Sequence, residues 1–126
     1  MRTEKDHIAH SSIILGVRNI EESIDFYQEI LGFTCTFKWQ EPPTYAVVKR
    51  GDTSIHLAFR TDPVISSSPI LYIFCNDINS YYQEILKKGA KILEPLSSAQ
   101  DYGMNEFALQ DNIGYRLIFG SQRSTT

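Results

Sequence analysis

The stretch SIILGVRNIEESIDFYQEIL, residues 12–31, opens with an apolar run and ends just before Gly32. The apolar run is typical of a β-strand, Asn19 is a good N-cap for the helical stretch that follows, and Gly32 is a good helix stop. The plan returns at ILYIFCND, residues 70–77, followed by a second helical stretch that ends at Gly89. A long repeat present only twice predicts two pseudo-symmetric modules with a cleft between them, and a functional site in that cleft.

Each module continues outward from this stretch into three further strand-like runs. The expected strands are 10–18, 33–39, 45–49 and 54–59, then 70–76, 90–94, 104–110 and 115–120. Residues 60–69 contain two prolines and three serines and are interpreted as a linker, whereas Pro95–Gly103 is interpreted as a loop that could form a lid or rim. The sequence therefore predicts one domain over residues 1–126, made of two β-α-β-β-β modules at 10–59 and 70–121.

Composition narrows the class of protein. The chain has 126 residues, and its 12 basic and 15 acidic residues give a net charge of −3, which argues against non-specific nucleic-acid binding. No apolar run is long enough to span a membrane, and the N-terminus lacks the apolar core of a signal peptide, so we expect a cytoplasmic protein without membrane contact. Cys35 and Cys75 have no CxxC partner and are interpreted as reduced thiols.

Two motifs resemble a known family. Residues 19–27 read NIEESIDFY and are followed by Leu31-Gly32-Phe33, while residues 102–115 read YGMNEFALQDNIGY. Together they resemble the glyoxalase / bleomycin-resistance / extradiol-dioxygenase superfamily, also called the vicinal oxygen chelate fold, in its bleomycin-resistance-like branch. The resemblance implies an α+β fold whose eight strands form an incomplete barrel with a central cleft. It also implies a homodimer, with modules paired within a chain or exchanged between chains.

The resemblance further implies four cleft positions that hold a metal in the metal-dependent members. In this chain those positions correspond to Ser12, His56, Ile70 and Ile118. A catalytic divalent cation is usually held by about three ligands from His, Cys, Asp or Glu, and among these four positions only His56 carries such a ligand. We therefore expect no metal and no other cofactor, although His10 and Glu106 could join His56 in a displaced site.

Four side chains are candidates for contact with a ligand in the cleft. His56 and Glu106 could serve as a general base and acid, or could pair with each other, and the competing interpretation is an ordinary structural role for each. Trp39 and Tyr102 are candidate walls for a flat ligand. With the four positions above, the predicted ligand-binding set is Ser12, Trp39, His56, Ile70, Tyr102, Glu106 and Ile118.

The sequence supports three functional hypotheses. The first is a metal-free protein, resembling bleomycin-resistance proteins, that sequesters a small molecule in the cleft. The second is a glyoxalase-like lyase or isomerase that uses a displaced metal site or acid–base catalysis by His56 and Glu106. The third is an interaction module with a vestigial cleft. The ligand set favours the first, and nothing in the sequence identifies the ligand.

Overall fold

A computed structural model of the chain describes residues 5–98 and 102–122. The first half contains β1 (Ile13–Val17), α1 (Ile20–Glu29), β2 (Thr34–Trp39), β3 (Tyr45–Arg50) and β4 (Thr53–Phe59). The second half contains β5 (Pro69–Phe74), α2 (Ile78–Lys87), β6 (Lys91–Ser97), β7 (Met104–Gln110) and β8 (Arg116–Gln122). The β-α-β-β-β order therefore occurs twice, as the repeat in the sequence predicts.

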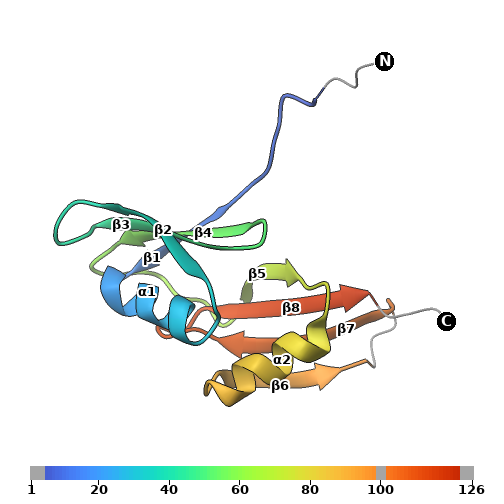
Figure 1. The fold of residues 1–126 in the computed structure, drawn as a ribbon. Coiled ribbons are helices and arrows are strands. Elements are labelled where there is room, and N and C mark those ends of the chain that lie inside the picture. Colours follow the sequence, from blue (N-terminus) through green and yellow to red (C-terminus); the bar gives the residue numbers. More distant parts are fainter. Residues whose placement is uncertain (1–4, 99–101, 123–126) are drawn as a thin grey trace.

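The strands form two separate four-stranded sheets of the same topology (Figure 1). The strand orders are β1-β4-β3-β2 and β5-β8-β7-β6. Within each sheet the first strand pairs in parallel with the last, and the other pairs are antiparallel. The α+β fold is confirmed, and the two sheets are not closed into a barrel.

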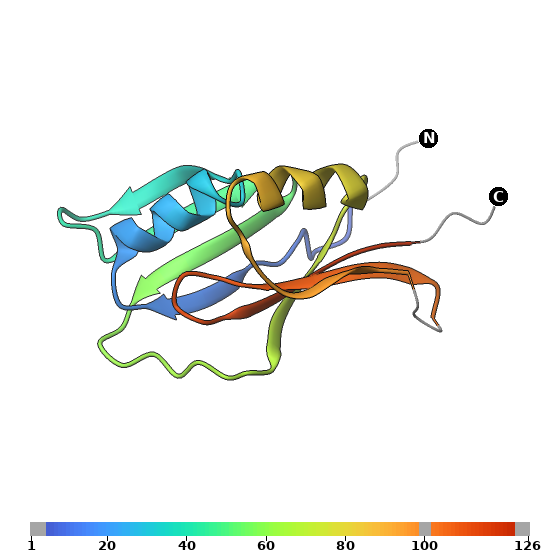
Figure 2. The same cartoon turned by 90° about the horizontal axis from the view of Figure 1, so that it is seen from below.

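Both helices begin at the caps that the sequence indicates. The side chain of Asn19 accepts a hydrogen bond from the backbone N–H of Glu22 at 3.0 Å, and Asp77 accepts one from Ser80 at 3.1 Å. Gly32 follows the first helix with a φ of 76°, which a residue with a side chain rarely adopts. Figure 2 shows both helices on the same side of the molecule, with the connection from β4 to β5 along the opposite side.

The hydrophobic core lies between the helices and one face of each sheet. Alternate strand residues such as Leu15, Leu57 and Leu117 are almost completely buried, as the two-residue period of a strand requires. The two halves share this core, because their buried hydrophobic residues form one cluster. The hydroxyl of the buried Tyr27 in α1 also donates to Asp111, in the turn before β8, at 2.8 Å. Packing therefore fixes which face of each sheet the helices cover.

The loop expected at Pro95–Gly103 is shorter in the structure. Strand β6 continues to Ser97 and pairs there with Glu106, so that residues 95–97 belong to the sheet. Residues 99–101 of the expected loop lie outside the described residues. Within the described part of the chain, no helix has the length and apolar character needed to cross a membrane.

Candidate functional site

Each sheet has an outer face, opposite the helices, where the candidate residues lie. We define the outer face of the first sheet by Ile14, Phe37, Trp39, Tyr45, Val47, His56 and Ala58, which register with one another across β1, β4, β3 and β2. We define the outer face of the second sheet by Tyr72, Phe74, Glu106, Ala108, Ile118 and Gly120. No hydrogen bond, ion pair or ring contact among residues 5–98 and 102–122 joins these two faces.

On the outer face of the first sheet, His56 is held by a tyrosine. The Tyr45 hydroxyl lies 2.7 Å from His56 Nδ1, and the two rings meet edge to face with centroids 5.6 Å apart. His56 stands in β4 between the buried Ile55 and Leu57, so strand alternation turns its half-buried ring outward. Within the described residues Nε2 has no hydrogen-bond partner, so it is the ring nitrogen left to meet a ligand.

On the outer face of the second sheet, Glu106 accepts hydrogen bonds from two tyrosines. The Tyr72 hydroxyl donates to Oε2 at 2.6 Å and the Tyr102 hydroxyl donates to Oε1 at 2.7 Å. The pKa of Tyr72 is raised mainly by burial and next by its hydrogen bond to Glu106. The pKa of Tyr102 is raised mainly by its own hydrogen bond to Glu106. Both phenols therefore stay protonated at neutral pH and act as donors to the carboxylate.

The remaining predicted site residues surround these two clusters. Ile118 is half-buried and registers with Tyr72, whereas Trp39 is 56% exposed and Ile70 is 43% exposed. Ser12 lies just before β1, and its hydroxyl contacts that of Ser54. The structure thus brings Glu106 and Tyr102 together, with Ile118 on the same face.

The structure does not bring His56 and Glu106 together within one chain. Each lies on a different sheet, and each already has its own tyrosine partner. The pairing considered from the sequence is therefore not formed in the single chain.

Two tyrosines hold the candidate side chains: Tyr45, for which the sequence favours ordinary packing over contact with a ligand, and Tyr72, which the sequence analysis does not single out. Their roles depend on which residues register across neighbouring strands. One local signal was present, because Gly120 lies inside β8 and a strand glycine often marks a close approach. A methyl group at this position would overlap the Tyr72 hydroxyl, so Gly120 is what lets Tyr72 reach Glu106.

The side chains at the four positions that the family resemblance assigns to metal ligands do not fit a metal ion. Two of them are isoleucines, Ser12 contacts another serine, and His56 alone offers a strong ligand atom. Across the described ranges, 5–98 and 102–122, no three His, Cys, Asp or Glu side chains are grouped closely enough to hold one. His10, which could have joined a displaced site, lies in the exposed segment before β1.

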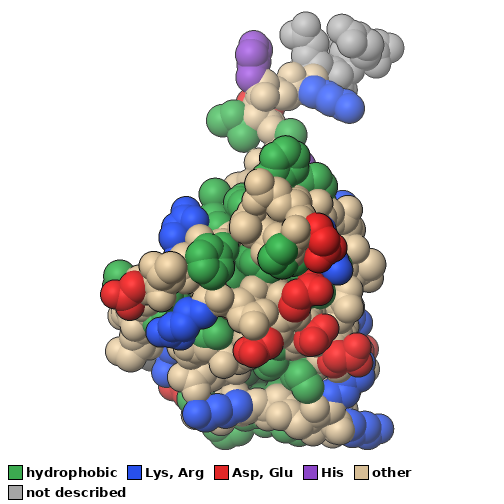
Figure 3. All heavy atoms as spheres, turned by 90° about the vertical axis from the view of Figure 1, so that its left-hand side faces the viewer, with side chains coloured by type: hydrophobic (Ala, Val, Ile, Leu, Met, Phe, Trp, Pro, Cys, Tyr) green, Lys and Arg blue, Asp and Glu red, His purple; other side chains and the backbone are tan. Residues whose placement is uncertain are grey.

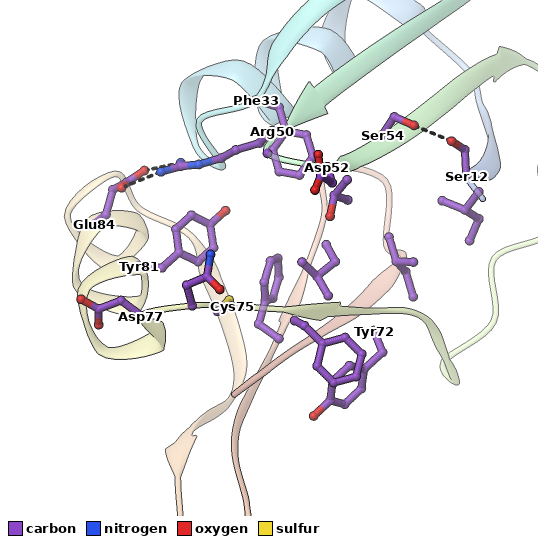
Figure 4. Close-up of a pocket in the computed structure, with 18 of the residues that line it drawn as sticks. Ser12, Phe33, Arg50, Asp52, Ser54, Tyr72, Cys75, Asp77, Tyr81 and Glu84 are labelled. Atoms are coloured by element: carbon purple, nitrogen blue, oxygen red, sulfur yellow. Dashed lines mark hydrogen bonds and ion pairs between the residues drawn. The ribbon is translucent and has the colours of Figure 1, made fainter. Parts of the chain in front are cut away.

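A cavity of about 900 Å³ lies between the two halves of the chain and includes Tyr72 and Phe74 of the second sheet in its lining (Figure 4). Its walls come from the start of β1, the turn between β3 and β4, strand β5 and the first turns of α2. Ser12 is the predicted site residue that contributes to this lining. Tyr72 also borders it, but its ring points away from the first sheet in Figure 4.

Comparison with known proteins agrees with this architecture. A family model described as the Glyoxalase/Bleomycin resistance protein/Dioxygenase superfamily matches residues 6–119. A glyoxalase family protein from Bacillus anthracis is 19% identical with a TM-score of 0.77, and the match covers 95% of this chain and 100% of that one. TioX from Micromonospora sp. ML1 is 15% identical with a TM-score of 0.77, covering 90% and 99% respectively.

A third solved structure, a glyoxalase/bleomycin resistance protein/dioxygenase from Alicyclobacillus acidocaldarius, is 19% identical with a TM-score of 0.75. The match covers 98% of this chain and 96% of that one. No curated protein sequence matches the chain at a significant level. At these identities the structural likeness shows a common fold, and the chemistry has to be argued from this chain's own residues.

Proposed function

The chain belongs to the glyoxalase/bleomycin resistance protein/dioxygenase superfamily, and from this premise we propose that it binds a small organic molecule without a metal ion or other cofactor. The binding surface is the outer faces of its sheets. The observation that carries this proposal is the Glu106 carboxylate, fixed by Tyr72 and Tyr102 on a face that also presents Ile118. Such a surface combines an oriented acceptor with apolar area, which is what a small-molecule site needs.

The chemistry of the two faces indicates the kind of ligand. Carboxylate oxygens accept hydrogen bonds, so Glu106 suits a ligand that carries an N–H or O–H group. Trp39 and Phe37 are 56% and 48% exposed on the outer face of the first sheet and offer flat apolar area. We therefore expect a molecule with an aromatic or other flat apolar part and a hydrogen-bond donor, bound and released unchanged.

A second copy of the chain would complete this site. Ile14 is 61% exposed and Phe74 is 75% exposed, one on each outer face, and exposed apolar area of this kind marks interaction surfaces. Figure 3 shows hydrophobic side chains at the surface, among acidic and basic ones, on the side of the molecule that is at the left in Figure 1. We propose a homodimer in which the outer face of the first sheet of one copy covers the outer face of the second sheet of its partner.

An isomerase or lyase is the second candidate function, and one observation favours it. His56 Nε2 is left without a partner among the described residues, so it could move a proton if the homodimer brings it near a bound molecule. The proposals differ in one readout, because an enzyme converts the molecule and a binding protein returns it unchanged.

The first test is a thermal-shift screen of aromatic small molecules on protein freed of metal by chelation. We expect a compound that raises the melting temperature, and weaker binding of that compound in both Trp39→Ala and Glu106→Gln. His56→Ala serves as the control for catalysis, with mass spectrometry of the recovered compound as the readout. Tight uptake of nickel, zinc or manganese that is lost in His56→Ala would contradict the metal-free proposal.

A further inference from the structure

We propose that the cavity between the two halves of the chain is a second binding site, for an organic cation with an apolar body. It borders the outer face of the second sheet at Tyr72 and Phe74, but none of the proposed ligand contacts Glu106, His56 and Trp39 lines it. Its volume of about 900 Å³ lies within the range of known ligand pockets.

The interior wall of this cavity is apolar. Phe33, Ile73 and Phe119 border it from the core side and are 5%, 8% and 1% exposed. Ile13 and Leu71 extend this surface along the first strands of the two sheets. Such a wall favours a ligand with an aromatic or aliphatic body, because contact removes apolar area from water.

One end of the cavity is closed by an ion pair that joins the two halves (Figure 4). Arg50 Nη1 and Nη2 donate to the two Glu84 oxygens at 2.7 and 3.2 Å, and the guanidinium lies 4.9 Å from the centre of the Tyr81 ring. The hydrogen bond from Arg50 lowers the pKa of Glu84, so the pair stays charged and satisfied at neutral pH. A ligand could therefore bind Arg50 or Glu84 only by breaking the ion pair between them.

Among the described residues, Asp52 is the acidic residue of the lining whose carboxylate has neither a hydrogen bond nor an ion pair. Besides the ion pair, the lining contains Asp77, which already caps α2 through Ser80. Figure 4 shows Asp52 on the β3–β4 turn, directed toward β5. A free carboxylate above an apolar wall suits an amine that carries an apolar body.

Cys75 provides a built-in probe of this cavity. Its half-buried thiol borders the space, and burial raises its pKa to about 11, so the thiol is protonated at neutral pH. A disulfide reagent such as 4,4′-dithiodipyridine should therefore react slowly, and a ligand seated in the cavity should slow the reaction further. The Cys35→Ser background removes the other cysteine from the measurement.

The test measures protection of Cys75 in Cys35→Ser protein by 2-naphthylmethylamine and, as a matched anion, by 2-naphthoate. We expect saturable protection by the amine, none by the anion, and roughly fivefold weaker protection in Asp52→Asn, since an exposed ion pair is worth up to about a factor of five. Glu106→Gln should leave the protection unchanged.

Several outcomes would overturn this second site. One is equal protection of Cys75 by the amine and the anion. Another is protection that is lost in Glu106→Gln but kept in Asp52→Asn. A third is a Cys75 thiol that reacts in urea but never in the folded protein. The emission of Trp39 in the same titrations reports the outer face of the first sheet instead. A failure at Cys75 with a response at Trp39 would therefore leave the proposed function standing.

Discussion

In the first sheet, Tyr45 in β3 bonds His56 in the adjacent β4, whereas in the second sheet Tyr72 in β5 reaches over β8 to Glu106 in β7. The register makes Tyr45 and Glu106 equivalent positions, since Tyr45 pairs with Ala58 in β4 and Glu106 pairs with Gly120, the corresponding residue in β8. One backbone frame thus holds an imidazole in one half and a carboxylate in the other. The comparison teaches that the repeat preserves the frame while each outer face has its own side-chain chemistry.

A second pair of equivalent positions shows how the difference is built. Ile14 and Tyr72 occupy the same place in the first strands of the two sheets, and Ala58 and Gly120 occupy the same place in the last. Isoleucine leaves room for the alanine, whereas the tyrosine needs a glycine beneath it. The pair of Tyr72 and Gly120 therefore orients the Glu106 carboxylate in the second sheet, and the first sheet has no such pair.

The largest effect we predict comes from the turns before β4 and β8. Asp111 is buried, accepts from Tyr27, and also accepts from the backbone N–H groups of Ile113, Gly114 and Tyr115. Asp111→Ala should lower the free energy of unfolding by about 3–4 kcal/mol, because several buried donors lose their acceptor. Urea unfolding monitored by circular dichroism measures this loss.

The matched control is the exposed Asp52 in the equivalent turn of the first half. Asp52→Ala should change the free energy of unfolding by no more than about 0.5 kcal/mol, as for most exposed sites. If the two variants lose similar stability, the turns are energetically equivalent and the account of Asp111 as a joint between the halves is wrong.

The next effect concerns Gly120. Gly120→Ala should displace the Tyr72 ring and lower the free energy of unfolding by about 1–2 kcal/mol, the usual cost of overpacking. The displaced phenol leaves Glu106 and becomes more exposed, so the pKa of Tyr72 should fall, which ultraviolet titration of the tyrosines can detect. The double variant Gly120→Ala/Tyr72→Ile, which places at position 72 the residue type of the equivalent Ile14, should recover most of the lost stability. A double variant as unstable as Gly120→Ala would show that a contact other than the one with Tyr72 is responsible.

The smallest of these effects lies in the ion pair between the halves. Glu84→Gln should lower the free energy of unfolding by up to about 1 kcal/mol at neutral pH, because both partners are partly exposed. The pKa of Glu84 is lowered from 4.5, so its contribution is complete above that pH and is lost as the pH falls through the lower folded value. Unfolding curves of the two proteins should therefore converge in acid, and a gap that persists at low pH would exclude the ion pair as its cause.

Much of the fold follows from local sequence signals. Asn19 and Asp77 cap helices where an N-cap is expected, and strand alternation places His56 and Glu106 on the faces opposite the helices. The expected loop Pro95–Gly103 begins later in the structure, because β6 continues through Pro95 to Ser97. Strand β6 lies at the edge of its sheet, where a proline is tolerated because one side of the strand needs no hydrogen bond.

The details of the site required the three-dimensional register. Tyr45 and Tyr72 find their partners across strands that are distant in sequence, which no local pattern specifies. The inter-half cavity is a product of how two separately formed sheets pack, and the pairing of Arg50 with Glu84 depends on that packing too. Such contacts lie beyond the range of periodicity and capping rules.

The most direct test of the account is a titration of Trp39 emission with the strongest compound from the thermal-shift screen, on metal-stripped protein. Trp39 is the only tryptophan in the chain and lies on the outer face of the first sheet. We predict a saturable change that persists after chelation and is weakened by about tenfold in Glu106→Gln, as expected when a charge-assisted hydrogen bond is lost. Binding that disappears on chelation and returns with nickel or zinc would contradict the account.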